Sequence, residues 1–166
     1  RTTRRLVTSL TRAESDALLA APDRTTWLGR RDHALLFVCL QTGLRVSELV
    51  GLRCRDIVLT TGAHVRCLGK GRKQRCTPLR PETATMLDAW LRERHGLPDN
   101  PVFPSIRGGK LSRDAIEHLI TKYTAIAIQA CPSFKRKKVS PHVLRHAAAM
   151  DLLHHGVDRS VIALWL

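Results

Sequence analysis

Arg45 is the first residue whose type and position could do chemistry. It follows Gly43-Leu44 at the start of an expected short helix, where a guanidinium is well placed to clamp an anion. Its planar fork can donate two parallel hydrogen bonds to a phosphodiester. It could instead form an ordinary helix-surface pair with Glu48, three residues later. The sequence leaves both interpretations open.

A basic cluster lies at an expected hairpin turn, where Lys70 stands between two glycines and is followed by Arg72, Lys73 and Arg75. Nearby positive charge makes a lysine release its proton more readily, so Lys70 could protonate a leaving oxygen. Alternatively, the turn only touches backbone phosphates, which is the commonest role of such residues. It lacks the spacing of a nucleotide-binding phosphate loop.

His142 and Arg145 lie at the start of a helix that Ser140-Pro141 is expected to open. Their spacing puts both side chains on one face, and the N–H groups of a helix start favour an anion. Histidine can also transfer protons near neutral pH. His142 and His146 could hold a metal ion, but no acidic or cysteine residue is spaced as a third ligand, so we expect none.

The composition points to nucleic acid as a partner. The 166 residues include 28 Lys and Arg against 14 Asp and Glu, a formal net charge of +14. Such an excess attracts a polyanion. We expect contacts to the DNA backbone from Arg72, Lys73 and Arg75 and from the basic run Lys135, Arg136, Lys137 and Lys138. A basic protein of the ribosomal type is the plainer alternative.

The cysteines and apolar runs indicate a protein of the reducing cytoplasm. The five cysteines are odd in number and form no Cys-x-x-Cys pair, unlike a secreted disulfide framework. No apolar run approaches the ~20 residues of a membrane span, so no membrane partner is expected. No signal peptide is visible in the basic N-terminal segment.

Hydrophobic periodicity and capping residues predict one mainly α domain with a small three-stranded antiparallel β-sheet. The expected strands are 56–60, 64–68 and 75–79, and the expected helices are 11–21, 30–41, 45–52, 81–95, 113–130, 140–155 and an unfinished one from Val157. Thr11 and Glu14 match a capping box for the first helix.

Taken in order, the three segments resemble motifs of the tyrosine recombinase (phage integrase) family. Thr42-Gly43-Leu44-Arg45-x-Ser47-Glu48-Leu49 resembles the first arginine motif. Gly69-Lys70-Gly71, with Arg75 and Pro78-Leu79 behind it, resembles the catalytic-lysine hairpin. His142-x-x-Arg145-His146 resembles the H-x-x-R box, and Leu152-Leu153-x-x-Gly156-Val157 resembles the segment after it.

The resemblance implies a role for each matching residue. Arg45 and Arg145 would grip the scissile phosphate, and Lys70 would be the general acid for the leaving 5′ oxygen. His142 would assist proton transfer and contact the phosphate, while Glu48 would hold the site together. A tyrosine would form a 3′-phosphotyrosyl link with double-stranded DNA, without metal, ATP or another cofactor.

The sequence departs from the family pattern in its tyrosines. Tyr123 is the only one, and it lies on the apolar face of an expected helix, so we interpret it as a core residue. We expect the nucleophile and a preceding Gly-His or Gly-Trp pair beyond Leu166. Residues 1–166 would then be one catalytic domain of a larger recombinase, without its N-terminal DNA-clamping domain. Alone it should bind DNA weakly and not cleave it, unless a neighbouring recombinase protomer supplies a tyrosine.

Other functional classes remain open at this point. A non-catalytic DNA-binding module would share the same basic surface, and a type IB topoisomerase would share the same chemistry. A basic helical RNA-binding protein would not explain the order of Arg45, Lys70, His142 and Arg145, which we expect to converge on one concave surface. The sequence names neither the target DNA site nor the mobile element or host system.

We expect the affinity for a DNA duplex to fall steeply as salt rises, because each neutralised phosphate releases counterions. A titration at several salt concentrations measures the slope. A binding constant that stays flat between low and moderate salt would contradict an interface dominated by phosphate contacts.

Overall fold

The computed structural model describes residues 9–156, apart from the side chain of Lys70; the helix expected from Val157 lies outside this range. Within it, six α-helices and one antiparallel sheet confirm the expected fold class. The helices are α1 (Arg12–Ala20), α2 (Trp27–Thr42), α3 (Val46–Val50), α4 (Pro81–Arg94), α5 (Arg113–Ala130) and α6 (Pro141–His154). The strands are β1 (Ile57–Val58), β2 (His64–Leu68) and β3 (Gln74–Pro78).

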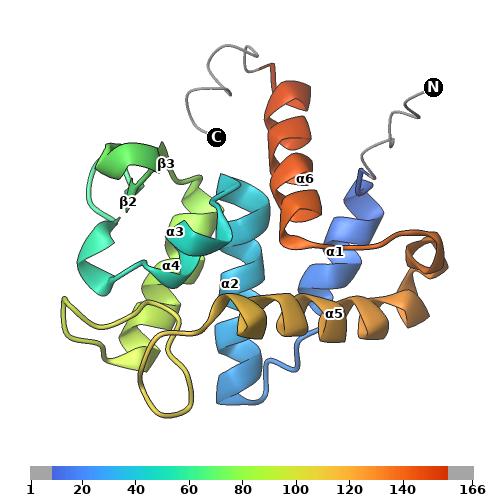
Figure 1. Cartoon of the computed structure of the whole chain (residues 1–166), viewed down its shortest axis with the longest axis horizontal. Coiled ribbons are helices and arrows are strands. Elements are labelled where there is room, and N and C mark those ends of the chain that lie inside the picture. Colours follow the sequence, from blue (N-terminus) through green and yellow to red (C-terminus); the bar gives the residue numbers. More distant parts are fainter. Residues whose placement is uncertain (1–8, 157–166) are drawn as a thin grey trace.

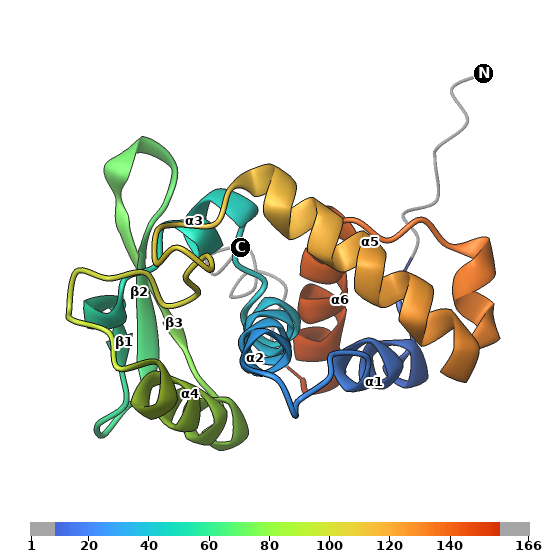
Figure 2. The same cartoon turned by 90° about the horizontal axis from the view of Figure 1, so that it is seen from below.

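Helix α2 lies at the centre of the fold, with other elements on its two sides (Figure 1, Figure 2). Helices α1, α5 and α6 lie on one side, and α4 and the sheet lie on the other. The apolar middle of α2 is buried as expected, and Leu35, Leu36 and Val38 are 0% exposed. Burying several large side chains per helix in this way stabilises the centre, because each contributes about 2 kcal/mol.

Helix α2 begins three residues before the expected start. Thr26 caps it by accepting a 3.0 Å hydrogen bond from the Gly29 N–H. Trp27 then packs against Trp90 of α4, with ring centroids 5.4 Å apart. At the other end Gly43 adopts a left-handed φ of 67°, which ends α2 and lets the chain turn into α3.

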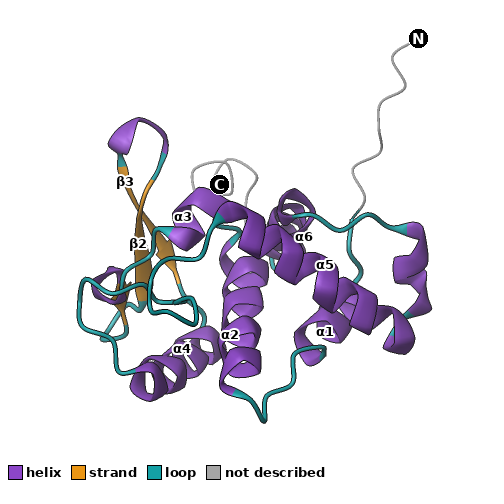
Figure 3. Cartoon of the chain, turned by 60° about the horizontal axis from the view of Figure 1, so that its bottom comes forward, coloured by secondary structure: helices purple, strands orange, loops and turns teal. Residues whose placement is uncertain are grey.

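The sheet has the order β1-β2-β3, and its longer pair is a hairpin that stands away from the helices (Figure 3). The register places Cys67 of β2 directly opposite Arg75 of β3. Opposite residues of an antiparallel pair share a face, so both side chains point to the same side of the hairpin. At the tip, the short 3₁₀ turn η2 (Lys70–Arg72) carries Lys70.

The predicted capping box at α1 is confirmed, and its glutamate also binds two side chains of the segment 132–138. Glu14 accepts the Thr11 N–H at 2.8 Å, and its own N–H donates to the Thr11 hydroxyl. The Glu14 side chain is fully buried, and it also accepts from Ser133 at 2.7 Å and from the Lys137 ammonium. Lys137 is therefore held by a buried carboxylate, and its expected contact with the DNA backbone stays a prediction.

Tyr123 is a core residue, as the sequence predicted. It is 4% exposed, and its hydroxyl donates to Asp32, which also pairs with Arg31 at 2.7 Å. Burial, and then the hydrogen bond to Asp32, raise the pKa of the Tyr123 phenol. A buried, protonated phenol fixed in this way is not placed to attack a phosphate.

All five cysteines are free thiols. Among the described residues, no helix is long and apolar enough to cross a membrane.

We expect Glu14→Gln to destabilise the protein by about 3 kcal/mol, as for breaking a buried ion pair. Glutamine keeps the capping box, so the loss would report the contact with Lys137. Burial by itself would raise the pKa of Glu14, but the hydrogen bonds from Lys137, the Thr11 N–H and Ser133 outweigh it and lower the pKa to about 2.

The wild-type contribution should therefore be complete above the ordinary pKa of 4.5 and vanish as the pH falls towards 2. Urea unfolding at several pH values measures it, with the exposed Lys135→Gln as a control that should change little. Equal stability of wild type and Glu14→Gln at neutral pH would refute the role of this pair.

Candidate phosphate-binding site

Arg45 occupies the N-cap position of α3, and its side chain is exposed. Its backbone N–H, not its guanidinium, donates to Glu48 Oε1 at 2.9 Å. Among the described residues no carboxylate forms an ion pair with the Arg45 guanidinium. The local fold thus leaves this cation available for an external anion.

The Glu48 carboxylate pairs with Arg75 of the hairpin. Arg75 Nη2 lies 2.8 Å from Oε1 and 2.9 Å from Oε2, and the Cys67 thiol donates to Oε2 at 3.1 Å. Glu48 is 6% exposed, and the Arg75 side chain is 15% exposed. Arg75, expected only as a DNA-backbone contact, is therefore a largely buried partner of Glu48.

Arg145 of α6 faces the same group of charges. Burial lowers its pKa most, the positive charges of Arg45 and Arg75 lower it further, and the Glu48 carboxylate opposes the shift. An arginine nevertheless stays protonated in proteins. Three guanidinium groups around one carboxylate leave an excess of positive charge, which an anion such as a phosphodiester can neutralise.

The surface beside this cluster is concave. An open pocket of about 470 Å³ lies between the start of α3 and the tip end of β2; Arg45, Ser47, Glu48, Leu68 and Gly69 line it. Lys70 follows Gly69 directly in the chain. The pocket therefore joins the arginine motif to the hairpin that carries the expected general acid.

The other predicted site residues are divided between α6, the hairpin tip and the segment 132–138. His142 is exposed on α6, one turn before Arg145. Arg72 and Lys73 are exposed at the hairpin tip. The segment 132–138 lies at the opposite end of the long axis from the hairpin (Figure 1, Figure 2), with Lys135, Arg136 and Lys138 exposed. Exposed cations thus occupy both ends of the molecule.

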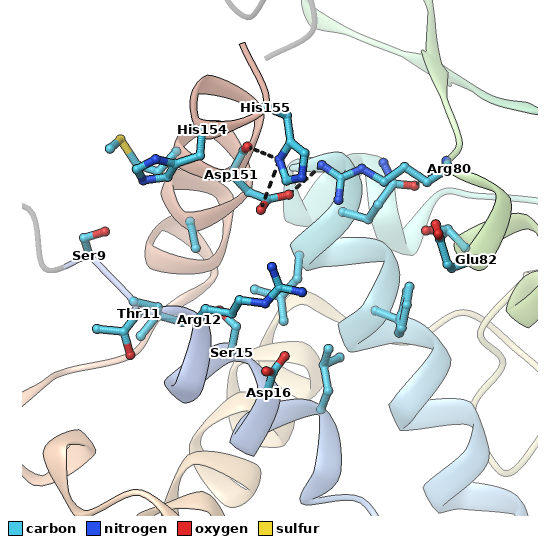
Figure 4. A pocket seen from close by; sticks show the side chains of 18 of the residues that line it. Ser9, Thr11, Arg12, Ser15, Asp16, Arg80, Glu82, Asp151, His154 and His155 are labelled. Carbon is cyan, nitrogen blue, oxygen red and sulfur yellow. Dashed lines mark hydrogen bonds and ion pairs between the residues drawn. The ribbon is translucent and has the colours of Figure 1, made fainter. Parts of the chain in front are cut away.

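A larger open cavity, of about 790 Å³, lies apart from the predicted site. Helices α1, α2 and α6 and the start of α4 line it. Arg80 points toward Asp151, their charged atoms 2.6 Å apart, and His155 lies beside them (Figure 4). None of the predicted site residues lines this cavity, and no sequence motif indicated it.

Sequence reasoning missed one polar group at the site, the Cys67 thiol. The alternation of β2 places Cys67 on the buried face with Val65, which reads as an ordinary core position. Only the register with Arg75 brings the thiol to Glu48. Among the described residues, no group of three His, Cys, Asp or Glu side chains is arranged to hold a metal ion.

Comparison with known proteins gives one consistent result. The model of the Phage integrase family matches residues 8–166. An integrase/recombinase of Sinorhizobium fredii, y4rC, is 54% identical over the whole chain and 50% of its own length. Tyrosine recombinase XerD of Pseudomonas aeruginosa is 40% identical over 95% of the chain and 52% of its own length. The chain thus spans about half the length of these curated relatives.

Solved structures share the fold. The crystal structure of XerA recombinase superposes with a TM-score of 0.83 at 29% identity, covering 100% of this chain and 56% of XerA. XerH site-specific recombinase, in a pre-cleavage complex with its difH substrate, gives 0.78 at 25% identity over 96% of this chain and 46% of XerH.

We expect Glu48→Gln to cost about 3 kcal/mol of stability, because it leaves the largely buried Arg75 without its counter-charge. Chemical unfolding measures the change. Asp88→Asn is the matched control, since it breaks an exposed pair with Arg92 worth well under about 1 kcal/mol. Similar small losses in both variants would show that Glu48 does not hold the arginine cluster.

Proposed function

The chain belongs to the phage integrase family, and we propose that it forms the phosphate-activating part of a site-specific DNA recombinase. The observation that carries the proposal is the Glu48 carboxylate, which pairs with Arg75, accepts the Arg45 N–H and acts electrostatically on Arg145. Such a cluster, on a chain of net charge +14, favours a phosphodiester of double-stranded DNA as its ligand.

In the proposed mechanism, Arg45 and Arg145 bind the non-bridging oxygens of the scissile phosphate. Attack on the phosphorus increases negative charge on these oxygens, so cations fixed beforehand stabilise the transition state more than the ground state. Arg75 supports the site indirectly. It pairs with Glu48, and its positive charge acts on Arg145. Losing one clamping arginine should slow cleavage by about 10²–10³-fold, by analogy with an oxyanion-hole donor.

Lys70 and His142 are the proposed proton-transfer groups. Lys70 lies at the hairpin tip, next to the pocket beside Arg45, and protonates the 5′ oxygen as it leaves. His142 is exposed on the helix face that also presents Arg145, and it contacts the phosphate and assists the transfer. Exposed Arg72, Lys73, Lys135, Arg136 and Lys138 bind the flanking backbone.

The nucleophile is a tyrosine outside the residues described here. Tyr123 is buried and donates to Asp32, which excludes it from attack. We propose that the tyrosine comes from another part of the polypeptide or from a second protomer of the same kind. Its attack yields a 3′-phosphotyrosyl link and frees the 5′ hydroxyl, so the energy of the phosphodiester is kept for rejoining. Chromosomal or mobile-element DNA in the cytoplasm is the proposed setting.

The test is capture of the covalent intermediate with the full-length polypeptide that contains this sequence. A library of nicked duplexes with randomised sequence lets the cleaved fragment diffuse away and traps the adduct, which a denaturing gel separates. We expect an adduct in wild type, and about 10²–10³-fold slower formation in Arg45→Ala and Arg145→Ala.

Arg107 is exposed and lines a different pocket, with Leu28 and Leu111, so Arg107→Ala is the control and should form adduct at the wild-type rate. DNA binding without any adduct across the library would refute the recombinase and leave a DNA-binding module. Adducts on every sequence, formed by a single protomer, would instead indicate a topoisomerase.

A further inference from the structure

The Cys67 thiol donates a hydrogen bond to the Glu48 carboxylate, and the proposed reaction gives this thiol no role. Its sulfur lies 3.1 Å from Glu48 Oε2, and the residue is 7% exposed. Burial, and then the hydrogen bond to Glu48, raise the pKa of this thiol to about 11. The thiol therefore keeps its proton at neutral pH and donates it to the carboxylate.

The donors on Glu48 come from two separate parts of the fold. Oε1 accepts from the Arg45 N–H at the start of α3 and from Arg75 of β3. Oε2 accepts from Arg75 and from Cys67 of β2. Because Cys67 and Arg75 are opposite each other in the sheet register, both strands of the hairpin attach to one carboxylate.

We propose that Cys67 is a positioning residue that fixes the hairpin carrying Lys70 against the helix start carrying Arg45. The terminal torsion of a glutamate is soft, so donors on both oxygens are needed to fix the plane of its carboxylate. Without the thiol, Arg75 alone joins the hairpin to Oε2. The tip end of the hairpin could then shift, and Lys70, two residues beyond Leu68, would shift with it. The inference rests on the proposed function for its effect on rate, but the contact itself does not.

Infrared spectroscopy of the S–H stretch tests the contact directly. A thiol that donates to a carboxylate absorbs at lower wavenumber than one in apolar surroundings, such as the buried Cys39 in the last turn of α2. Difference spectra against Cys67→Ser and Cys39→Ser assign the two bands. We expect the Cys67 band to lie lower, and to move towards the Cys39 band in Glu48→Gln. Coincident bands in the wild type would overturn the proposal.

Adduct formation tests the positioning role. Cys67→Val keeps the volume and removes the donor, while Cys67→Ser keeps a donor. We expect Cys67→Val to slow adduct formation about tenfold with unchanged DNA affinity, as for one lost hydrogen bond to a charged group, and Cys67→Ser to restore most of the rate. Equal rates in Cys67→Val and wild type would overturn it.

Two further measurements separate this role from plain stability and from the proposed function. Val65→Ala empties a buried position on the same face of β2 and should lower stability without changing the rate of the folded protein. If Val65→Ala slowed adduct formation as much as Cys67→Val does, any loss of hairpin stability would slow the reaction. That result would overturn a specific role for Cys67.

If the wild type forms no adduct, the proposed function fails. A double-mutant cycle of Cys67→Val and Glu48→Gln on the free energy of unfolding still tests whether the Cys67–Glu48 contact holds the hairpin. Coupled losses support it, because residues in contact are not additive, whereas additive losses overturn it.

Discussion

The buried carboxylate of Glu48 is the interaction on which the site depends. Three guanidinium groups close together repel one another, and the partial burial of Arg75 and Arg145 makes that repulsion stronger than in water. Glu48 offsets it by pairing with Arg75 and by accepting the Arg45 N–H. One carboxylate cannot neutralise three cations, so the free protein keeps an excess of positive charge. A phosphodiester that enters the cluster neutralises the remaining positive charge. The pairing with Glu48 therefore stabilises the fold, and the excess charge that is left favours binding of the phosphate.

The rest of the fold brings four separate segments to that carboxylate. The left-handed Gly43 ends α2 and starts α3 at Arg45, while the hairpin register puts Arg75 and Cys67 on one face. Ser140 caps α6 by accepting the Val143 N–H, so Arg145 emerges from the second turn. Because the buried α2 lies between the helical side and the sheet side, these segments meet across a fixed centre. Long-range packing thus sets the distances on which the chemistry depends.

Patterns of nearby residues in the sequence predicted the helices and strands, but contacts between residues far apart in the sequence could not be predicted. The capping box at Thr11, the apolar α2 and the helix start at Pro141 follow from spacing within a few residues. Family motifs indicated Arg45, Glu48 and Arg145 as one site, although no motif shows distances. The partners of Arg75 and Lys137 could not be read, because the ion pairs join residues 27 and 123 positions apart. A basic residue in a basic run gives no sign that a buried carboxylate already holds it.

Arg45 and Arg145 are proposed to bind the same phosphate, and a double-mutant cycle on DNA affinity would show whether they do. Arg45→Ala, Arg145→Ala and the double variant are titrated with one short duplex at fixed salt. Arg45→Ala with Lys135→Ala is the reference pair, because Lys135 belongs to the segment 132–138, which lies at the opposite end of the long axis from the hairpin. We expect a coupling energy of about 1 kcal/mol or more for the two arginines and none for the reference pair. Additive losses of binding energy, within about 0.5 kcal/mol in both cycles, would mean that the two arginines contact separate phosphates, and a shared phosphate site would be ruled out.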